Sequence, residues 1–99
     1  MPIYITLMNL TDKGIENIKR APQRIEEGII KMQEKKGKML GFYLTMGEYD
    51  YVAVFDAPSD EVAASFLLGL GATGFVRTST LKAFPGEEAG YIIKDIPVL

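Results

Sequence analysis

The residues best suited to chemistry lie in a short turn, Gly47-Glu48-Tyr49-Asp50, which precedes an apolar segment. A carboxylate and a phenol at the rim of a pocket could bind an amine or transfer a proton. The same residues would also make a stable hairpin turn. Glycine adopts a positive φ at no steric cost, and an aspartate accepts hydrogen bonds from loop N–H groups. We favour the structural role for Asp50.

Arg77, which is followed by Thr78, is the second candidate for chemistry. A guanidinium binds a carboxylate or a phosphate through two parallel hydrogen bonds. Alternatively, the arginine could lay its aliphatic stem on an apolar strand and reach solvent, or pair with Asp50, Asp56 or Glu48. We favour Arg77 over Asp50 as the ligand contact.

Five tyrosines in 99 residues could line an aromatic pocket, although packing in a core or an interface explains them equally well. The glycine-rich segment 69–74 is not a phosphate-binding loop, because it follows a helical segment instead of preceding one. No residue is assigned a catalytic role. The candidate ligand-binding residues are Arg77, Tyr49, Asp50, Glu48, Tyr43 and Thr78.

Composition excludes several classes of function. The chain has no cysteine and no histidine, which removes disulfides, thiol nucleophiles, histidine-based triads and the commonest zinc ligands. We expect no metal and no cofactor. A net charge of −2 argues against nucleic acid as a partner. The basic residues of segment 13–38 alternate with glutamates, which indicates a solvated helix face more than a phosphate-binding patch. With no signal peptide and no membrane span in the sequence, we expect a cytoplasmic protein.

The elements that must position these residues follow from hydrophobic periodicity. Four segments alternate or run apolar as strands do, and two carry helical stripes behind capping signals at Pro22 and Ser59. The link 46–48 is too short for a parallel crossover, so the strands around it form an antiparallel hairpin. The expected strands are 2–10, 38–45, 49–56 and 75–84, and the expected helices are 22–37, after a short helical turn beyond Thr11, and 59–70. The order βαββαβ predicts an α+β, ferredoxin-like fold, with two helices on one face of a four-stranded antiparallel sheet.

The second face of this sheet should be polar, yet the strands are apolar on both faces. In 49–56 we expect Tyr51, Ala53 and Phe55 to oppose Val52 and Val54. In 38–45 we expect Met39, Tyr43 and Thr45 to oppose Leu40, Phe42 and Leu44. A homodimer through the sheet faces would bury them, and the alternative is that the C-terminal tail covers the face.

The tail, residues 86–99, is too apolar for a free terminus, and we expect it to add an edge strand to its own sheet or to the partner's. The domain proper is then 1–85, and 86–99 is a C-terminal extension.

The stretches "GFYLTMGEYDYVAVFDAPSDE" and "FVRTSTLKAF" resemble the GYD domain family, from "YITLMNLTDKGIENIK" through Phe84. Phe75 departs from the family, which commonly has a polar residue there. The resemblance implies a dimeric α+β barrel and no established activity. The wider superfamily includes cofactor-independent monooxygenases, isomerases and decarboxylases, as well as ligand-sensing domains.

Three hypotheses of function follow. The first is a homodimer that binds a small metabolite in the cleft between helices and sheet. The second is a cofactor-independent enzyme of the monooxygenase or isomerase kind, with only tyrosine, arginine or carboxylate for acid–base chemistry. The third is an effector-sensing or assembly module without chemistry.

Overall fold

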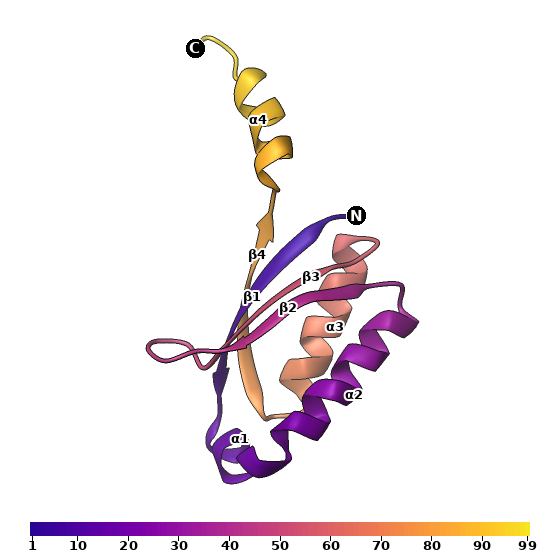
Figure 1. Ribbon diagram of the computed structural model, residues 1–99, viewed down its shortest axis with the longest axis vertical. Helices are drawn as coiled ribbons and strands as arrows, with labels where there is room; N and C mark the ends of the chain where they lie inside the picture. Colours follow the sequence, from indigo (N-terminus) through magenta and orange to yellow (C-terminus); the bar gives the residue numbers. More distant parts are fainter.

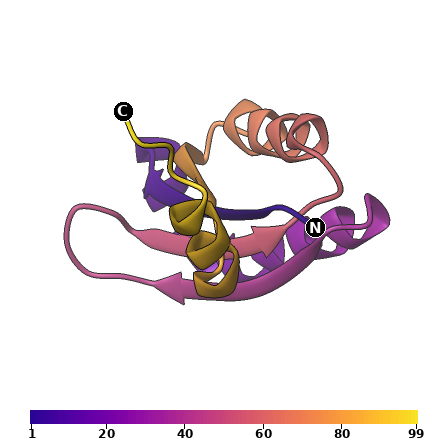
Figure 2. The same cartoon turned by 90° about the horizontal axis from the view of Figure 1, so that it is seen from above.

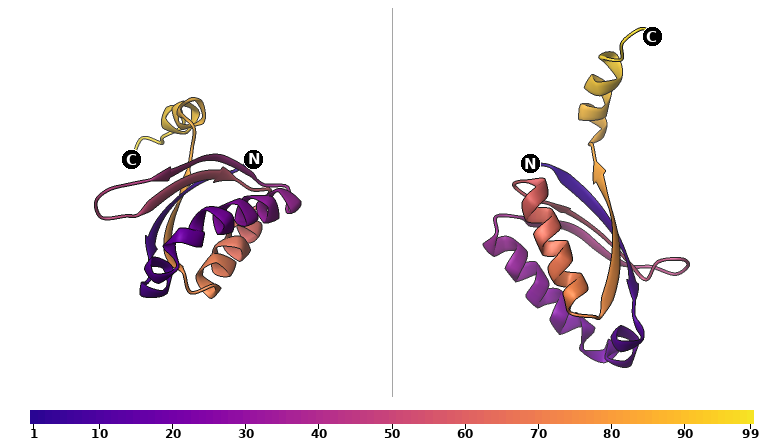
Figure 3. Two further views of the ribbon diagram at one scale, coloured as in Figure 1. Left: turned by 60° about the horizontal axis from the view of Figure 1, so that its bottom comes forward. Right: turned by 180° about the vertical axis from the view of Figure 1, so that it is seen from behind.

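A four-stranded antiparallel sheet is the centre of the fold in the computed structural model, which describes residues 1–99 (Figure 1). The elements along the chain are β1 (Ile3–Leu10), α1 (Asp12–Glu16), a 3₁₀ turn (Ile18–Arg20), α2 (Ala21–Glu34), β2 (Lys38–Leu44), β3 (Tyr51–Asp56), α3 (Asp60–Ala72), β4 (Val76–Ala83) and α4 (Gly86–Lys94). The strand order is β2-β3-β1-β4. Helices α2 and α3 lie on the same face of the sheet (Figure 3). The predicted α+β, ferredoxin-like architecture is confirmed.

Capping residues define where the helices begin. The Thr11 hydroxyl accepts from the N–H of Gly14 at 3.1 Å, and the Ser59 hydroxyl accepts from the N–H of Val62 at 3.2 Å. These bonds satisfy N–H groups that the first helical turn leaves unpaired.

A glycine at the end of a helix usually adopts the left-handed conformation, but Gly37, which ends the segment expected to form α2, does not. Lys36 is the residue in the left-handed region, with φ 69°. Gly37 is needed for a different reason, because a Cβ there would lie 2.8 Å from Cγ of Met32 and 2.9 Å from the carbonyl oxygen of Asp56. Glycine therefore permits the close approach of α2 to β3.

The core lies between the sheet and the two helices. Side chains alternate along β3, where Tyr51, Ala53 and Phe55 are buried and Val52 and Val54 are half-buried on the opposite face, as predicted. The Phe55 ring is 1% exposed, stacks on Tyr4 at 5.3 Å between centroids and meets Phe66 edge-on at 6.1 Å.

The predicted faces of β2 are wrong because its register with β3 shifts by one residue. Met39 lies opposite Phe55, Gly41 lies opposite Val54, and Leu40 has no partner. Met39 and Phe42 therefore share the face that packs on the helices. Such an extra residue reverses the alternation that follows it, and the periodicity of the sequence does not reveal it.

The face of the sheet opposite the helices, which we call the open face, is largely apolar. Cross-strand register places Ile5 beside Val54 and Leu81, and Leu7 beside Val52. No helix of the chain covers this face (Figure 3).

The C-terminal segment is a helix, not the edge strand expected from its apolar residues. Helix α4 continues from the end of β4 and extends away from the rest of the fold (Figure 1). In the view from above, α4 points toward the viewer and overlaps the sheet only in projection (Figure 2). Glu87 and Glu88 in its first turn and Lys94 in its last turn complement the helix dipole, which favours helix over strand. Its large side chains stay exposed, with Tyr91 at 64% and Ile93 at 63%.

Candidate ligand-binding cleft

A cleft of about 460 Å³ lies between α2, α3 and the covered face of the sheet, and 15 of the 22 residues that line it are hydrophobic. It is therefore suited to an apolar molecule. The larger side chains on its walls include Met8, Ile25, Phe42, Tyr51, Leu70 and Phe75.

Glycines help to leave this space open. Gly28 of α2 and Gly69 of α3 both line the cleft, and a Cβ added to either would meet no atom within 4 Å. Glycine costs a helix roughly 1 kcal/mol relative to alanine, so the two positions give up helix stability where a side chain would narrow the cleft.

Arg24 and Tyr51 bring polar chemistry to the cleft. The Arg24 guanidinium stacks on the Phe75 ring, with Cζ 3.9 Å from the centroid, and Nη1 donates to the carbonyl oxygen of Asn17 at 3.1 Å. Burial raises the pKa of the Tyr51 phenol, the positive charge of Arg24 partly offsets that rise, and Asp50 adds to it. The phenol therefore stays protonated at neutral pH and can donate a hydrogen bond.

The predicted hairpin residues lie outside the cleft. One carboxylate oxygen of Asp50 accepts from the N–H of Leu10 at 2.8 Å, and the carbonyl oxygen of Tyr49 accepts from the Thr45 hydroxyl at 2.6 Å. Glu48 is exposed in the turn beside Gly47, whose φ is 125°. These hydrogen bonds hold the turn in place against β1 and the end of β2. A ligand role for the three residues remains a prediction.

Arg77, Thr78 and Tyr43 are also not part of the cleft lining. Arg77 is exposed and donates to the carbonyl oxygens of Gly71 and Val76, each at 3.0 Å, so it holds the end of α3 against β4. It forms no ion pair with the aspartates or the glutamate that we considered. Tyr43 is 59% exposed on β2. The structure therefore does not gather the six candidates into one site.

A sequence profile of the GYD domain matches residues 4–93. The chain belongs to the GYD domain family. The match reaches into α4, farther along the chain than the resemblance through Phe84. The GYD domain is also 36% identical, over 86 residues, to a protein of Thermus thermophilus described as "Glutamine synthetase and cystathionine beta-lyase binding protein". The aligned region covers 86% of this chain and 90% of that relative.

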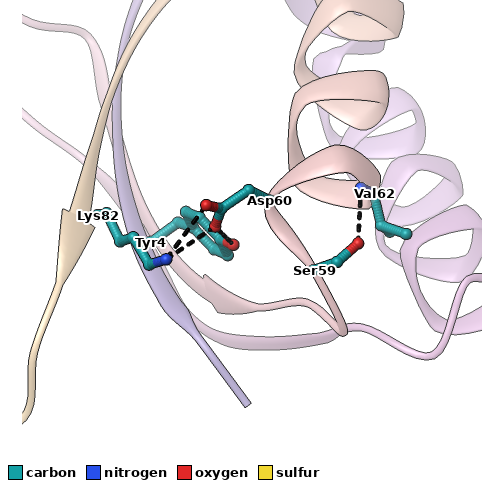
Figure 4. Close-up of polar contacts among 5 residues, drawn as sticks. All are labelled: Tyr4, Ser59, Asp60, Val62 and Lys82. Carbon is teal, nitrogen blue, oxygen red and sulfur yellow. Dashed lines mark hydrogen bonds and ion pairs between the residues drawn. The ribbon is translucent and has the colours of Figure 1, made fainter.

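A second polar cluster of this GYD domain, formed by Tyr4, Asp60 and Lys82, was not predicted (Figure 4). The Tyr4 hydroxyl donates to Asp60 at 2.5 Å, and Lys82 Nζ lies 3.1 Å and 3.2 Å from the two carboxylate oxygens. The bond from Tyr4 and then Lys82 lower the pKa of Asp60, whereas burial and the bond to Asp60 raise the pKa of Tyr4 to about 12. The three residues lie outside the cleft and tie the start of α3 to β1 and β4.

Sequence reasoning missed Arg24 as a cleft residue because it belongs to the basic segment that we assigned to a solvated helix face. Its partner Phe75 did carry a signal, since an aromatic residue stands where the GYD family commonly has a polar one. Nothing in the sequence joins positions 24 and 75, which the fold brings to a ring-stacking distance.

The structure of the GYD domain contains no group of three or more Asp or Glu side chains arranged to hold a metal ion. A helix that could span a lipid bilayer is not found in the structure.

Proposed function

We propose that this protein is a binding protein that works as a homodimer and holds a small, largely apolar molecule in the cleft between α2, α3 and the sheet. The cleft is the observation that carries the proposal. Its volume of about 460 Å³ falls within the roughly 300–1,000 Å³ of small-molecule sites, and its lining combines apolar walls with few polar groups, as such sites do.

The test begins with a thermal-shift screen against a metabolite library, because a ligand raises the melting temperature by mass action without any assumption about chemistry. A hit is then titrated into two matched variants, Gly28→Leu and Gly71→Leu. Both glycines lie in helices with open space around the Cβ position, but only Gly28 lines the cleft.

Gly28→Leu should abolish the shift and Gly71→Leu should keep it. If no compound shifts the melting temperature, or if a hit is insensitive to Gly28→Leu, the cleft is not the binding site.

The homodimer rests on the open face. Ile5, Leu7, Val52 and Val54 are only half-buried there, and Leu81 is 54% exposed. A contiguous apolar surface of this kind is costly in water and is typical of an interface. A second copy stacked face to face would bury it.

Light scattering at micromolar concentration should give the mass of a dimer. Val54→Glu should give a folded monomer, because it places a charge in the centre of the interface. Leu68→Glu, at an exposed position of α3, is the matched control and should leave the mass unchanged. A folded, monomeric wild-type protein would contradict the proposal.

Protein partners are a second candidate function, favoured by the relative described as binding glutamine synthetase and cystathionine β-lyase and by the exposed apolar residues of α4. Glutamine synthetase and cystathionine β-lyase, purified from the organism that encodes this protein, can be tested for binding by biolayer interferometry. Ile93→Asp in α4 should weaken binding at least tenfold, and Leu68→Asp in α3 should not. Absence of binding to either enzyme at micromolar concentration would reject these partners.

A further inference from the structure

Arg24 places a positive charge in the cleft that no acidic side chain neutralises. It lines the cleft, and no carboxylate oxygen lies within 4.0 Å of its guanidinium. Of the five N–H donors that an arginine carries, one is engaged, by the carbonyl oxygen of Asn17. The guanidinium lies over the Phe75 ring, and its remaining donors have no partner within the protein, so they are available to a ligand.

Tyr51 supplies a second donor on the same cleft. Its ring is 6% exposed and packs against Phe42, with 5.2 Å between centroids. The hydroxyl makes no hydrogen bond within the protein and is not among the polar atoms sealed from solvent, so it faces the cleft. Arg24 from α2 and Tyr51 from β3 therefore offer their donors to the same space.

The charges around the cleft favour a ligand with a single negative charge. Arg24 and Lys31 contribute two positive charges and Glu27 contributes one negative charge, which leaves a net charge of +1 among the lining residues. Two charges just outside the lining oppose each other: Lys13, with Nζ 4.5 Å from the centroid of the Phe75 ring, adds positive potential, and Asp50 adds negative potential near Tyr51. The rest of the lining is largely apolar, so the uncharged part of the ligand should be apolar as well.

We propose that the cleft binds a monocarboxylate with an apolar body, with the carboxylate accepting hydrogen bonds from Arg24 and Tyr51. This assignment rests on the proposed function of the cleft and adds the chemical class of the ligand. A guanidinium matches carboxylate and phosphate alike. The net charge of the lining matches a monoanion better than a phosphate monoester, which carries between one and two negative charges at neutral pH.

Three probes that share an alkyl chain and differ in the head group separate the contribution of the charge from that of the apolar body. They are decanoate, 1-decanol and decyl phosphate, each titrated below its aggregation limit and followed by backbone amide NMR. Decanoate should bind about 10- to 100-fold more tightly than 1-decanol, which is the gain expected from hydrogen bonds to a charged group. Decyl phosphate should bind no more tightly than decanoate.

The variants assign this preference to residues. Arg24→Gln should remove the preference for decanoate and leave the affinity for 1-decanol unchanged. Tyr51→Phe should lower the affinity for decanoate several-fold and leave the affinity for 1-decanol unchanged. Arg20→Gln is the matched control, since Arg20 is exposed and lies outside the cleft, and it should change neither affinity.

Equal affinity for decanoate and 1-decanol would overturn the carboxylate assignment and leave the cleft as a binding site. Tighter binding of decyl phosphate would replace the carboxylate by a phosphate. If none of the three probes binds, the inference fails, and the proposed function is then judged by the library screen alone.

Discussion

Asp50 connects the hairpin to the end of β1, and its replacement should destabilise the fold without involving a ligand. The pairing of β1 with β3 ends at Met8 opposite Tyr51, so the N–H of Leu10 has no partner on β3. The Asp50 carboxylate takes that place at 2.8 Å. The Asp50 backbone is held separately, through its N–H to the carbonyl oxygen of Met8 at 2.9 Å and its carbonyl oxygen to the N–H of Thr45 at 2.8 Å.

Asp50→Ala removes only the side-chain bond and leaves the half-buried Leu10 N–H unpaired. A hydrogen bond to a charged group contributes about 1.5–3 kcal/mol, and partial access of water reduces the loss to about 1–2 kcal/mol. For a domain of this size that loss lowers the melting temperature by about 4–16 °C. Asp50→Asn retains an acceptor oxygen and should cost less than about 1 kcal/mol.

Urea denaturation followed by circular dichroism, at one fixed protein concentration, measures both free energies of unfolding. Glu48→Ala is the control, because Glu48 is exposed in the same turn, and it should stay within about 0.5 kcal/mol of wild type. The reasoning is refuted if Asp50→Ala is as stable as wild type. If Asp50→Asn is as damaging as Asp50→Ala, the negative charge and not the acceptor is what stabilises the hairpin.

Three other perturbations test the core, the polar cluster and the cleft wall. Phe55→Ala should cost about 3–5 kcal/mol, because the ring is 1% exposed and leaves a cavity; a change below 1 kcal/mol in urea denaturation would remove Phe55 from the core. The free energy of unfolding should fall as pH drops below about 4, since the pKa of Asp60 is lowered in the fold, and should fall again as pH rises from about 10 to about 12, since the pKa of Tyr4 is raised. Melting temperatures of Tyr4→Phe measured over a pH series should show smaller declines at both the acid and the alkaline end. Declines equal to those of wild type would show that the cluster does not contribute to the pH dependence of stability. Gly28→Ala should raise the melting temperature by gaining up to about 1 kcal/mol of helix propensity in open space, and a decrease would show that the space around Gly28 is filled.

The element order, the helix starts and the hairpin could be predicted because each depends on neighbours in the sequence. The Ser59 cap, the turn at Gly47 and the alternation along β3 are local signals of this kind. The register shift at Leu40 depends on pairing with another strand, and α4 shows that apolar content alone does not distinguish a strand from an exposed helix.

The candidate site was less predictable than the fold. Sequence reasoning placed the ligand between helices and sheet, but selected polar residues by type, and those residues lie in the turn and on β2 and β4. Arg24 and Tyr51 are 27 positions apart and line one cleft because α2 and β3 both contribute to its walls. The Tyr4–Asp60–Lys82 cluster joins residues 56 and 22 positions apart and has no motif that would reveal it.

The unpaired residue of β2 sets which changes in length the strand can accept. Met39 and Gly41 face consecutive residues of β3, so a deletion of Leu40 would leave an unbroken ladder and keep every other β2 side chain on its present side. A deletion of Gly41 would have the same result, because Leu40 could take its place opposite Val54, whereas a deletion at any position from Phe42 to Leu44 would move at least one remaining residue to the other face. A gap at Leu40 or at Gly41 could thus arise during divergence without exchanging side chains between the cleft and the open face.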